Sequence, residues 1–556
     1  MVRRMATISS QSGTRARTVL RLQVKFVSLR HGNDMRRIGA WLWQRRIGLA
    51  GWLAVAVFAT LVGRFWHPCY GFTKFLMLDE RAARAGVHEL RDNPVYVYGE
   101  DGGYDGRYYV QIAFHPGLDA PDLAGGMDNF SYRARRILGS ALAWVLAGGA
   151  PCRIAGTYAA LNLGVWFVLA GLLWRLLAVT GWRSWLAWAG LLFSAGALHS
   201  VRLALPDLLG ATLLAAMMLL AERQRRSAAF GALALAGLAR ETTLAAVVAL
   251  WAGPWRAPHA WLRNLGRVAL VALPLVLWLV YVHLKAGPLD SGVSNFSWPF
   301  VGWVEKGVAA VYDLFHLPGY FRWLGVTTLL AFVGLTVQAV FLLRRPDVND
   351  AWWRLGAVYV AMMLGLGTSV WEGQPGAAVR VLLPLRLAFA VRAVRLRAGL
   401  VWLLAGNLTV FSGVLALWHV PTAPRELAAG RAGGDAYLVQ LGDGWFGTER
   451  QRSHVWAWSA GRAGLELKLW APGRAAMRVS LGLRSLARRP LEIRQEGRVI
   501  WRGEVGPKLQ QIHFSMKRSA TDTTQLEFVA SGEPVRESAG AGARPLSFAV
   551  YDVRID

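Results

Sequence analysis

The sequence predicts an α-helical polytopic membrane protein, with about ten to twelve transmembrane helices, followed by a C-terminal β-sandwich domain. Hydrophobic residues make up 54% of the chain and its mean hydropathy is +0.32, which is high for a soluble protein. These residues are concentrated in blocks of about 20, the length that crosses a bilayer as a helix. After residue 420 the blocks give way to short segments in which apolar and polar residues alternate, as they do in strands.

The N-terminal tail, residues 1–46, carries eleven Lys and Arg against one acid, Asp34. The first apolar run follows at 47–66 and is too long for a cleaved signal peptide. The positive-inside rule therefore places the tail in the cytoplasm. The net charge of +28 lies mostly in this tail and between apolar blocks, where anionic lipid attracts it. We therefore expect a membrane partner and no nucleic acid.

The transmembrane domain is predicted at 47–420, with a periplasmic loop at 67–135. One segment, 227–252, is interrupted by Arg240 and Glu241. It either crosses once or re-enters as two half-helices, and this choice sets the side on which the chain emerges. The predicted spans are 47–66, 136–150, 153–178, 183–199, 203–221, 227–252, 266–284, 321–343, 353–370, 377–393 and 397–419.

The β-sandwich domain is predicted at 430–556. Seven segments alternate at period two and are separated by turn-rich linkers such as 495–497, a pattern typical of an antiparallel sandwich. The predicted strands are 464–470, 477–483, 491–495, 498–502, 510–516, 524–529 and 546–554. The chain has only two cysteines, Cys69 and Cys152, and they show no metal-ligand spacing.

Reactive side chains are densest in the first loop, in the sequence GEDGGYDGRYYVQIAFHP at 99–116. A short helix is predicted from Arg107 to His115, with Asp105 at its N-cap. Two interpretations of Asp105 stay open: it caps this helix, or it abstracts a proton from a sugar hydroxyl as a general base.

A second cluster lies at 128–137, where the chain enters a predicted span. On a helix, Arg133 and Arg136 share a face and Tyr132 stacks over Arg136, with Asp128 or Ser131 as the cap. Arginines at the outer end of a span bind a lipid phosphate or pyrophosphate, or extend towards lipid headgroups.

Charged residues also interrupt the apolar blocks, where they are costly and face a cavity or one another. Arg240 and Glu241 point about 100° apart on a helix, so each needs a partner from another helix, and Asp207 and Arg202 are candidates. Arg380 follows a Gly-Gln-Pro break and either binds phosphate or marks the end of a span. The sequence contains no Walker loop, dinucleotide fingerprint or zinc-protease motif, which argues against a nucleotide-driven pump.

Three strings carry a resemblance to a known family: GYDGRYYVQIAFHP at 103–116, MDNFSYRARRILGSALAWVLAGG at 127–149 and GLARETTLAAV at 237–247. They resemble bacterial cell-surface glycopolymer formation proteins, which are similar to the GT-C membrane glycosyltransferases. The chain departs from the family at Gly139 and Ser140, where an aromatic residue and a proline are usual.

The resemblance implies a multi-pass glycosyltransferase of the bacterial inner membrane that acts in cell-surface polysaccharide formation. It implies a hexosyl or pentosyl transfer from a polyprenyl-phosphate sugar to an envelope glycan or lipid on the periplasmic side. Asp105 takes the role of catalytic base, and Arg133, Arg136 and Arg240 bind the phosphate or hold the core together. The resemblance identifies no metal ligand and no firm cofactor. It leaves open whether a divalent cation binds. The expected substrate-binding residues are Tyr104, Tyr108, Tyr109, Arg133, Arg136, Arg202, Arg240, Glu241 and Arg380.

The C-terminal sequence also resembles β-sandwich domains appended to some membrane glycosyltransferases. Trp445, Glu449, Trp456 and Trp458 either line a sugar surface or pack inside the sandwich. A glycan-related role requires this domain to be periplasmic, which is the topology we expect.

Two other functions remain open at this level. The first is a flippase or transporter of lipid-linked sugars, although the sequence lacks the matching halves that are frequent in transporters. The second is a structural subunit of an envelope complex.

Overall fold

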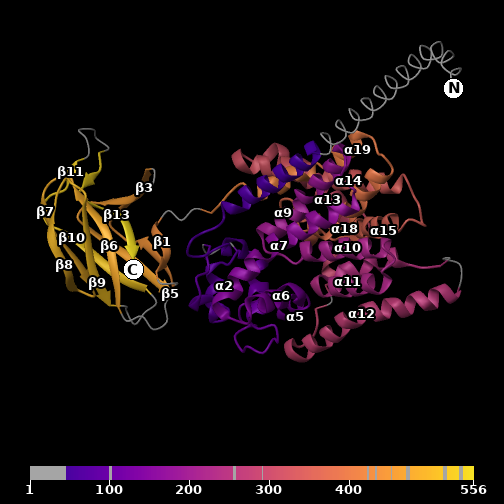
Figure 1. Ribbon diagram of the computed structural model, residues 1–556, viewed down its shortest axis with the longest axis horizontal. Coiled ribbons are helices and arrows are strands. Elements are labelled where there is room, and N and C mark those ends of the chain that lie inside the picture. The colour runs from indigo at the N-terminus through magenta and orange to yellow at the C-terminus, as the bar shows by residue number, and fades with distance from the viewer. Residues whose placement is uncertain are drawn as a thin grey trace, which may run out of the picture.

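The computed structural model describes residues 45–98, 103–253, 258–290, 292–421, 425–432, 435–451, 454–470, 476–517, 523–536 and 543–556. The predicted basic tail lies almost entirely outside these ranges. A large helical body forms one part of the molecule, and a β-sandwich lies beside it (Figure 1). The predicted fold class, an α-helical membrane protein with a C-terminal β-sandwich, is confirmed.

The helical body begins with the helix Arg45–Gly63 and the 3₁₀ turn η1 (Thr73–Leu76). The next helices are α2 (Glu80–Ala85), α3 (Glu89–Asp92), α4 (Gly106–Phe114), α5 (Phe130–Ala134), α6 (Ile137–Ala147), α7 (Pro151–Leu176), α8 (Trp182–Leu192), α9 (Ala195–Arg202), α10 (Asp207–Glu222) and α11 (Arg226–Ala239). They are followed by the 3₁₀ helix η2 (Glu241–Leu250), α12 (Pro258–Ala286), η3 (Val293–Asn295), α13 (Val301–His316), α14 (Gly319–Leu343), α15 (Ala351–Gly365), α16 (Thr368–Trp371), α17 (Ala378–Val381), α18 (Leu383–Arg395), α19 (Leu400–Gly406) and α20 (Thr409–Ala416).

Four helices of the described ranges are long and apolar enough to cross a membrane: Arg45–Gly63, α7, α12 and α14. The other predicted spans are also helical, but they are shorter or broken. Helix α6, for example, has 11 residues and is about 16 Å long at 1.5 Å per residue. It packs on α7 as the predicted hairpin, yet it is too short to cross alone.

Several shorter helices end together at what we call the basic end of the body. Glu222 at the end of α10 accepts hydrogen bonds from Trp352 at the start of α15 and from Arg395 at the end of α18. Arg392 donates to the backbone oxygen of Arg345, which follows α14. The arginines in and beside the turns at this end are Arg223, Arg225, Arg226, Arg344, Arg345, Arg395 and Arg397.

The segment predicted at 227–252 is a re-entrant pair, α11 and η2, with Arg240 at its turn. Arg354, near the start of α15, donates to the backbone oxygens of Val248 and Ala249 at 2.9 Å each, so η2 returns to the basic end where α11 began. The two arms match in length, about 21 Å for 14 α-helical residues and about 20 Å for 10 residues of 3₁₀ helix. The segment therefore does not cross once.

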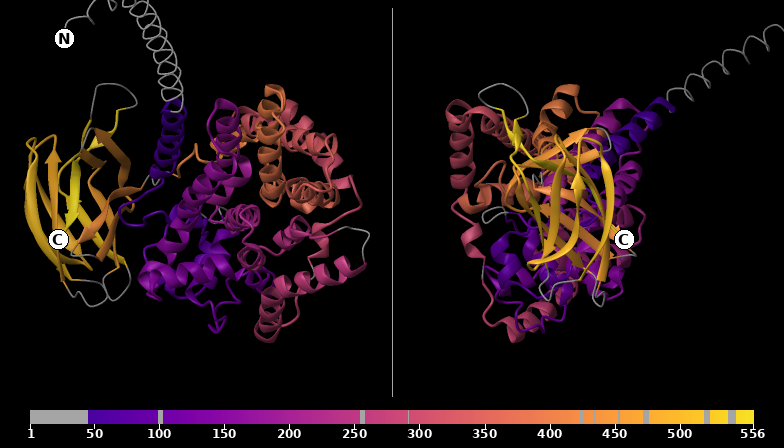
Figure 2. Two further views of the ribbon diagram at one scale, coloured as in Figure 1. Left: turned by 45° about the vertical axis from the view of Figure 1, so that its right-hand side comes forward. Right: turned by 90° about the vertical axis from the view of Figure 1, so that its left-hand side faces the viewer.

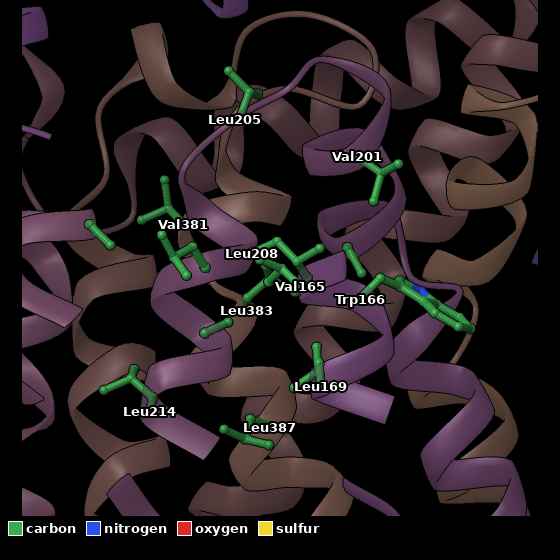
Figure 3. Packing of buried hydrophobic residues seen from close by; sticks show 14 of the residues in the cluster. Val165, Trp166, Leu169, Val201, Leu205, Leu208, Leu214, Val381, Leu383 and Leu387 are labelled. Atoms are coloured by element: carbon green, nitrogen blue, oxygen red, sulfur yellow. The ribbon is translucent and has the colours of Figure 1, made fainter. Parts of the chain in front are cut away.

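Apolar side chains from several helices fill the centre of the body (Figure 3). In this view Val165 of α7 lies close to Leu208 of α10, and Leu169 of α7 lies close to Leu387 of α18. The core is apolar where helices face one another, and many apolar side chains of α12 are exposed, as expected where a helix faces lipid.

The sandwich comprises β1 (Glu426–Ala432), β2 (Asp435–Leu441), β3 (Trp445–Gln451), β4 (His454–Ser459), β5 (Arg462–Trp470), β6 (Ala476–Ser485), β7 (Arg489–Gln495), β8 (Arg498–Val505), β9 (Gln510–Lys517), β10 (Thr523–Ala530), β11 (Val535–Arg536), β12 (Pro545–Leu546) and β13 (Phe548–Ile555). One main sheet has the order β1-β2-β5-β10-β7-β8 and the other β3-β4-β13-β6-β9. All seven predicted strands are present. The prediction missed β1 to β4 and the short β11, and β1 begins at Glu426, four residues before the predicted segment 430–556.

Of the two interpretations of the sandwich tryptophans, a sugar surface or internal packing, the structure shows mostly packing. Trp445 packs against the rings of Phe528 and Phe548, with centroids 6.0 and 5.6 Å away. Trp458 is buried. Trp456 donates to Glu449 at 3.0 Å. Within the described ranges, these residues belong to the sandwich's own structure.

The sandwich docks on the loop that follows the first helix (Figure 2). Cys69 packs against Ala436 and Leu438 of β2, and His67 lies 2.9 Å from Glu426. Burial, helped by the negative charge of Glu426, raises the pKa of Cys69 to about 12. The sandwich and the loop at 67–135 therefore lie on the same side of the body.

Candidate functional site: a cavity lined by arginines and acids

A cavity of about 450 Å³ lies where several helix ends meet, away from the basic end. We call it the arginine cavity. Its floor comes from the start of α10, the α11–η2 turn, the end of α15 and helix α17, and its walls come from the first loop and residues 290–296. Its charged lining residues are Arg133, Arg135, Arg136, Arg240, Arg380, Asp105, Asp128, Asp207, Glu241 and Asp290.

Asp105 lines this cavity and does not cap helix α4 with its side chain. The helix begins at Gly106, and the Asp105 carboxylate instead lies 2.8 Å from Arg133. About 30% of the carboxylate-bearing side chain is exposed. Asp105 therefore occupies the predicted N-cap position, but its side chain makes no capping hydrogen bond. The carboxylate is instead held by a cation while staying open to the cavity.

Arg133 also binds a second carboxylate, Asp128, through two hydrogen bonds of 2.6 and 2.9 Å. Burial alone would raise the pKa of Asp128, but the hydrogen bonds and charge of Arg133 and the N–H of Asn129 outweigh burial and lower it. The cap of α5 is Asn129, whose side chain accepts from Tyr132 N, so the predicted caps Asp128 and Ser131 are wrong.

Arg136 and Glu241 form a two-pronged ion pair of 2.8 and 3.0 Å across the cavity. Arg136 also donates to the hydroxyl of Tyr109 at 2.8 Å and lies over the ring of Tyr132 at 4.9 Å. The expected stacking of Tyr132 on Arg136 is present. Arg136 thus ties the first loop to the α11–η2 turn.

Arg240 pairs with Asp207, the first residue of α10. Asp207 is almost completely buried, so the pair sets the position of the α11–η2 turn on α10. Arg240 therefore pairs with Asp207, one of the two predicted partners. Glu241 pairs with Arg136 and not with the other predicted partner, Arg202.

Arg380 and Arg135 differ from these arginines, because neither contacts a carboxylate of the described residues. Arg380 is 6% exposed and donates to the hydroxyl of Tyr104 at 2.8 Å. Arg135 is 9% exposed, lies 5.2 Å from the ring of Tyr132, and its Nε has no hydrogen-bond partner. Two guanidinium groups therefore face the cavity without a carboxylate in direct contact.

Two expected site residues lie outside the arginine cavity. Arg202 donates to the hydroxyl of Tyr98 at 3.1 Å and to the backbone oxygen of Lys74, so it braces the loop near the sandwich. Tyr108 lies between the guanidinium groups of Arg107 and Arg133, each 4.7 Å from its ring. It faces a neighbouring cavity.

Sequence reasoning missed Arg135 and the segment at 290–296. Asp290 accepts from Asn129 at 2.9 Å, and Asn295 lies 3.4 Å from the Tyr132 hydroxyl. Arg135 adjoins Arg136 in the sequence, so the arginine cluster itself was visible. Arg135 was missed because the prediction placed only Arg133 and Arg136 on the shared helix face. The helix breaks between α5 and α6, which turns Arg135 towards the cavity.

The described residues around Asp105 form no cluster of metal ligands. Arg133 occupies the space between the carboxylates of Asp105 and Asp128, and the described ranges contain no group of three or more acidic, His or Cys residues placed to hold a metal ion.

No family model matches the chain, and no curated protein is similar to it. Among solved structures, the cryo-EM structure of the arabinosyltransferase EmbB from Mycobacterium smegmatis is similar at 13% sequence identity and a TM-score of 0.24, with 80% of this chain and 62% of that chain covered. The match thus spans less than two thirds of EmbB.

Proposed function

We propose that this protein is a membrane glycosyltransferase with a GT-C-like body. It moves a sugar from a polyprenyl-phosphate carrier to a hydroxyl of an envelope glycan or lipid. The observation that carries the proposal is the cavity that joins one partly exposed carboxylate, Asp105, to two guanidinium groups without a carboxylate in direct contact, Arg135 and Arg380. A proton acceptor beside phosphate-binding groups is the minimum that such a transfer needs.

The proposed reaction is a direct displacement at the anomeric carbon. Asp105 takes the proton of the acceptor hydroxyl, whose oxygen forms the new bond to the anomeric carbon. The bond from that carbon to the phosphate oxygen breaks, and polyprenyl phosphate leaves with the electron pair. Its added negative charge develops beside Arg135 and Arg380, whose forked donors match phosphate oxygens.

The paired arginines have a different role in this proposal. Arg136 and Arg240 are neutralised by Glu241 and Asp207, so they position the helix ends that form the cavity. Arg133 orients Asp105. The phosphate-binding role that the family resemblance gave to Arg133, Arg136 and Arg240 thus moves to Arg135 and Arg380.

The reaction side follows from charge. The arginine-rich turns of the basic end favour the cytoplasm under the positive-inside rule, and the arginine cavity opens at the other end of the short helices. We therefore propose a bacterial inner-membrane protein whose cavity and sandwich both face the periplasm.

The test uses the full chain in nanodiscs, undecaprenyl-phosphate sugars with a radiolabelled sugar, and membranes of a strain lacking the gene as acceptor. The wild type is expected to transfer label into the glycan or lipid fraction. Asp105→Asn should lower the rate at least 100-fold at unchanged protein level. Asp119→Asn, an exposed change in the same loop, is the matched control. Equal rates for the wild type and Asp105→Asn would overturn the catalytic assignment.

A further inference from the structure

A cavity of about 530 Å³ lies where the start of α7 meets the sandwich. Most of its lining comes from α7 between Cys152 and Gly164, with Leu146 from the end of α6 and Arg431 from β1. We call it the α7 cavity. It shares no lining residue with the arginine cavity, and the function proposed above leaves it without a role.

The helix surface inside the α7 cavity is bare. Gly156 and Gly164 line it, and a Cβ atom at either position would meet no described atom within 4 Å. The lining follows α7 from Cys152 to Gly164, about 18 Å at 1.5 Å per residue. One leaflet of a hydrocarbon core about 30 Å thick is about 15 Å deep. The cavity is therefore long enough to hold one acyl chain of a lipid along α7.

The depth of the α7 cavity in the membrane follows from its aromatic and apolar neighbours. Trp144, near the end of α6, is exposed, and its ring lies beside the backbone of Gly149 in the α6–α7 turn. Tryptophan is enriched at the membrane–water boundary. Phe167 and Val168, one turn beyond the cavity on α7, are exposed apolar residues, as expected against lipid chains. The start of α7 therefore lies at headgroup level.

Two arginines line the α7 cavity, Arg153 from α7 and Arg431 from the sandwich. Arg431 stands opposite Ala436 in the β1–β2 ladder, so both side chains project from the same face of the sheet. Ala436 packs against Cys69 of the first loop, and this face is therefore the docked one. Within the described part of the chain, neither guanidinium makes a hydrogen bond or ion pair, and the lining contains no acid.

We propose that the α7 cavity binds one anionic phospholipid, with its phosphate between Arg153 and Arg431 and one acyl chain along α7. Guanidinium forks match phosphate oxygens, and cations at headgroup depth attract anionic lipid. Because the two cations come from different parts of the molecule, the bound lipid joins the sandwich to the helical body. The assignment is independent of sugar transfer.

A helix from a second copy of the chain is the other occupant that a bare glycine surface accepts. An apolar helix in this position would cover Arg153 and Arg431 without supplying an anion, and covered charges without a partner are costly. The charge of the cavity therefore favours the phospholipid.

Native mass spectrometry of the full chain in detergent micelles counts bound lipids and subunits in one spectrum. Dioleoyl phosphatidylglycerol is titrated, with dioleoyl phosphatidylcholine as the zwitterionic comparison. Arg153→Gln and Arg431→Gln remove the cations, and Gly156→Leu fills the cavity from a position with open space. Arg498→Gln changes an exposed arginine of β8, at the opposite edge of the sheet from β1. Gly171→Leu changes an exposed glycine of α7 outside the lining, also with open space. These two variants are the controls.

The wild type is expected to bind one phosphatidylglycerol more tightly than phosphatidylcholine. Each of the three cavity variants should weaken phosphatidylglycerol binding about five-fold or more, the effect of one cation near a lipid surface, and both controls should bind like the wild type. Phosphatidylglycerol should also raise the thermal unfolding midpoint of the wild type more than that of Arg431→Gln, because it binds the native state. Undecaprenyl phosphate binding should be equal in all six proteins, since the proposed function assigns it to the arginine cavity.

Four results would overturn the proposal. They are equal phosphatidylglycerol affinity in the wild type and all three cavity variants, an equal loss in the two controls, and a loss of undecaprenyl phosphate binding in the cavity variants, which would make the α7 cavity a carrier site. The fourth is a wild-type dimer that Gly156→Leu dissociates, which would make it a subunit contact.

Discussion

The guanidinium group of Arg133 lies 2.8 Å from the carboxylate of Asp105, and the same group holds Asp128 at 2.6 Å. One cation therefore fixes two acids in the lining of the arginine cavity. The arrangement leaves Asp105 oriented and exposed, which is what a proton acceptor at a substrate site requires.

Arg133→Gln is expected to reduce sugar transfer at least ten-fold and to lower the free energy of unfolding by about 1.5–3 kcal/mol, the usual contribution of a hydrogen bond to a charged group. Arg133→Lys keeps the charge without the fork and should recover part of both losses. Transfer rates and thermal unfolding in nanodiscs measure the two effects. Full activity in Arg133→Gln would show that Asp105 needs no such partner.

The arginines without a carboxylate partner, Arg135 and Arg380, should contribute more to undecaprenyl phosphate binding than the arginines paired with acids. Arg135→Gln and Arg380→Gln are expected to weaken undecaprenyl phosphate binding about ten-fold or more, because each removes a charge-assisted contact worth about 1.5–3 kcal/mol. Thermal stability should change little, since neither side chain neutralises a carboxylate of the described residues. Tryptophan fluorescence titration gives the dissociation constant, and unchanged binding in both variants would contradict the phosphate assignment.

The Arg136–Glu241 pair should behave as a structural contact. Arg136→Gln leaves Glu241 without its cation and is expected to destabilise the protein by about 3–5 kcal/mol, as for other buried pairs. The double variant Arg136→Gln with Glu241→Gln removes both charges and should be more stable than Arg136→Gln alone. Thermal unfolding of the three proteins tests this. A double variant less stable than the single one would show that the two residues act independently.

The sandwich contact makes Cys69 unreactive. At pH 8 a thiol with a pKa of about 12 is ionised in only about one molecule in 10,000, and the thiolate is the reactive form. In Cys152→Ser protein, maleimide should therefore leave Cys69 unmodified until detergent denaturation, and Ala436→Asp, placed in the contact, should expose it. Mass spectrometry reports the modification. Rapid native labelling of Cys69 would show that the sandwich is not docked.

The re-entrant pair α11–η2 predicts that Arg223 and Arg263 lie on the same side of the membrane. In a chain with both cysteines replaced by serine, Arg223→Cys and Arg263→Cys should react with an impermeant maleimide only from the cytoplasmic side. Asp119→Cys should react only from the periplasmic side. If the segment crossed once, the first two positions would react from opposite sides.

The sequence by itself determined the features that depend on neighbouring residues. Apolar blocks predicted helices, period-two alternation predicted seven strands, and the segment around Asp105 indicated the loop of the proposed site. These patterns can be read locally because a helix or strand buries one face set by its own repeat. The broken segment at 227–252 was visible as well, since Arg240 and Glu241 interrupt its apolar run.

Only the tertiary structure decided which charges meet. Arg136 and Glu241 are 105 residues apart, and Tyr104 and Arg380 are 276 apart, so no local pattern fixes their contact. The same packing left Arg135 and Arg380 unpaired, turned α11–η2 back to the basic end, and placed the sandwich beside the first loop. A buried charge is stable only where another part of the chain supplies its partner, and that partner is set by how the helices pack.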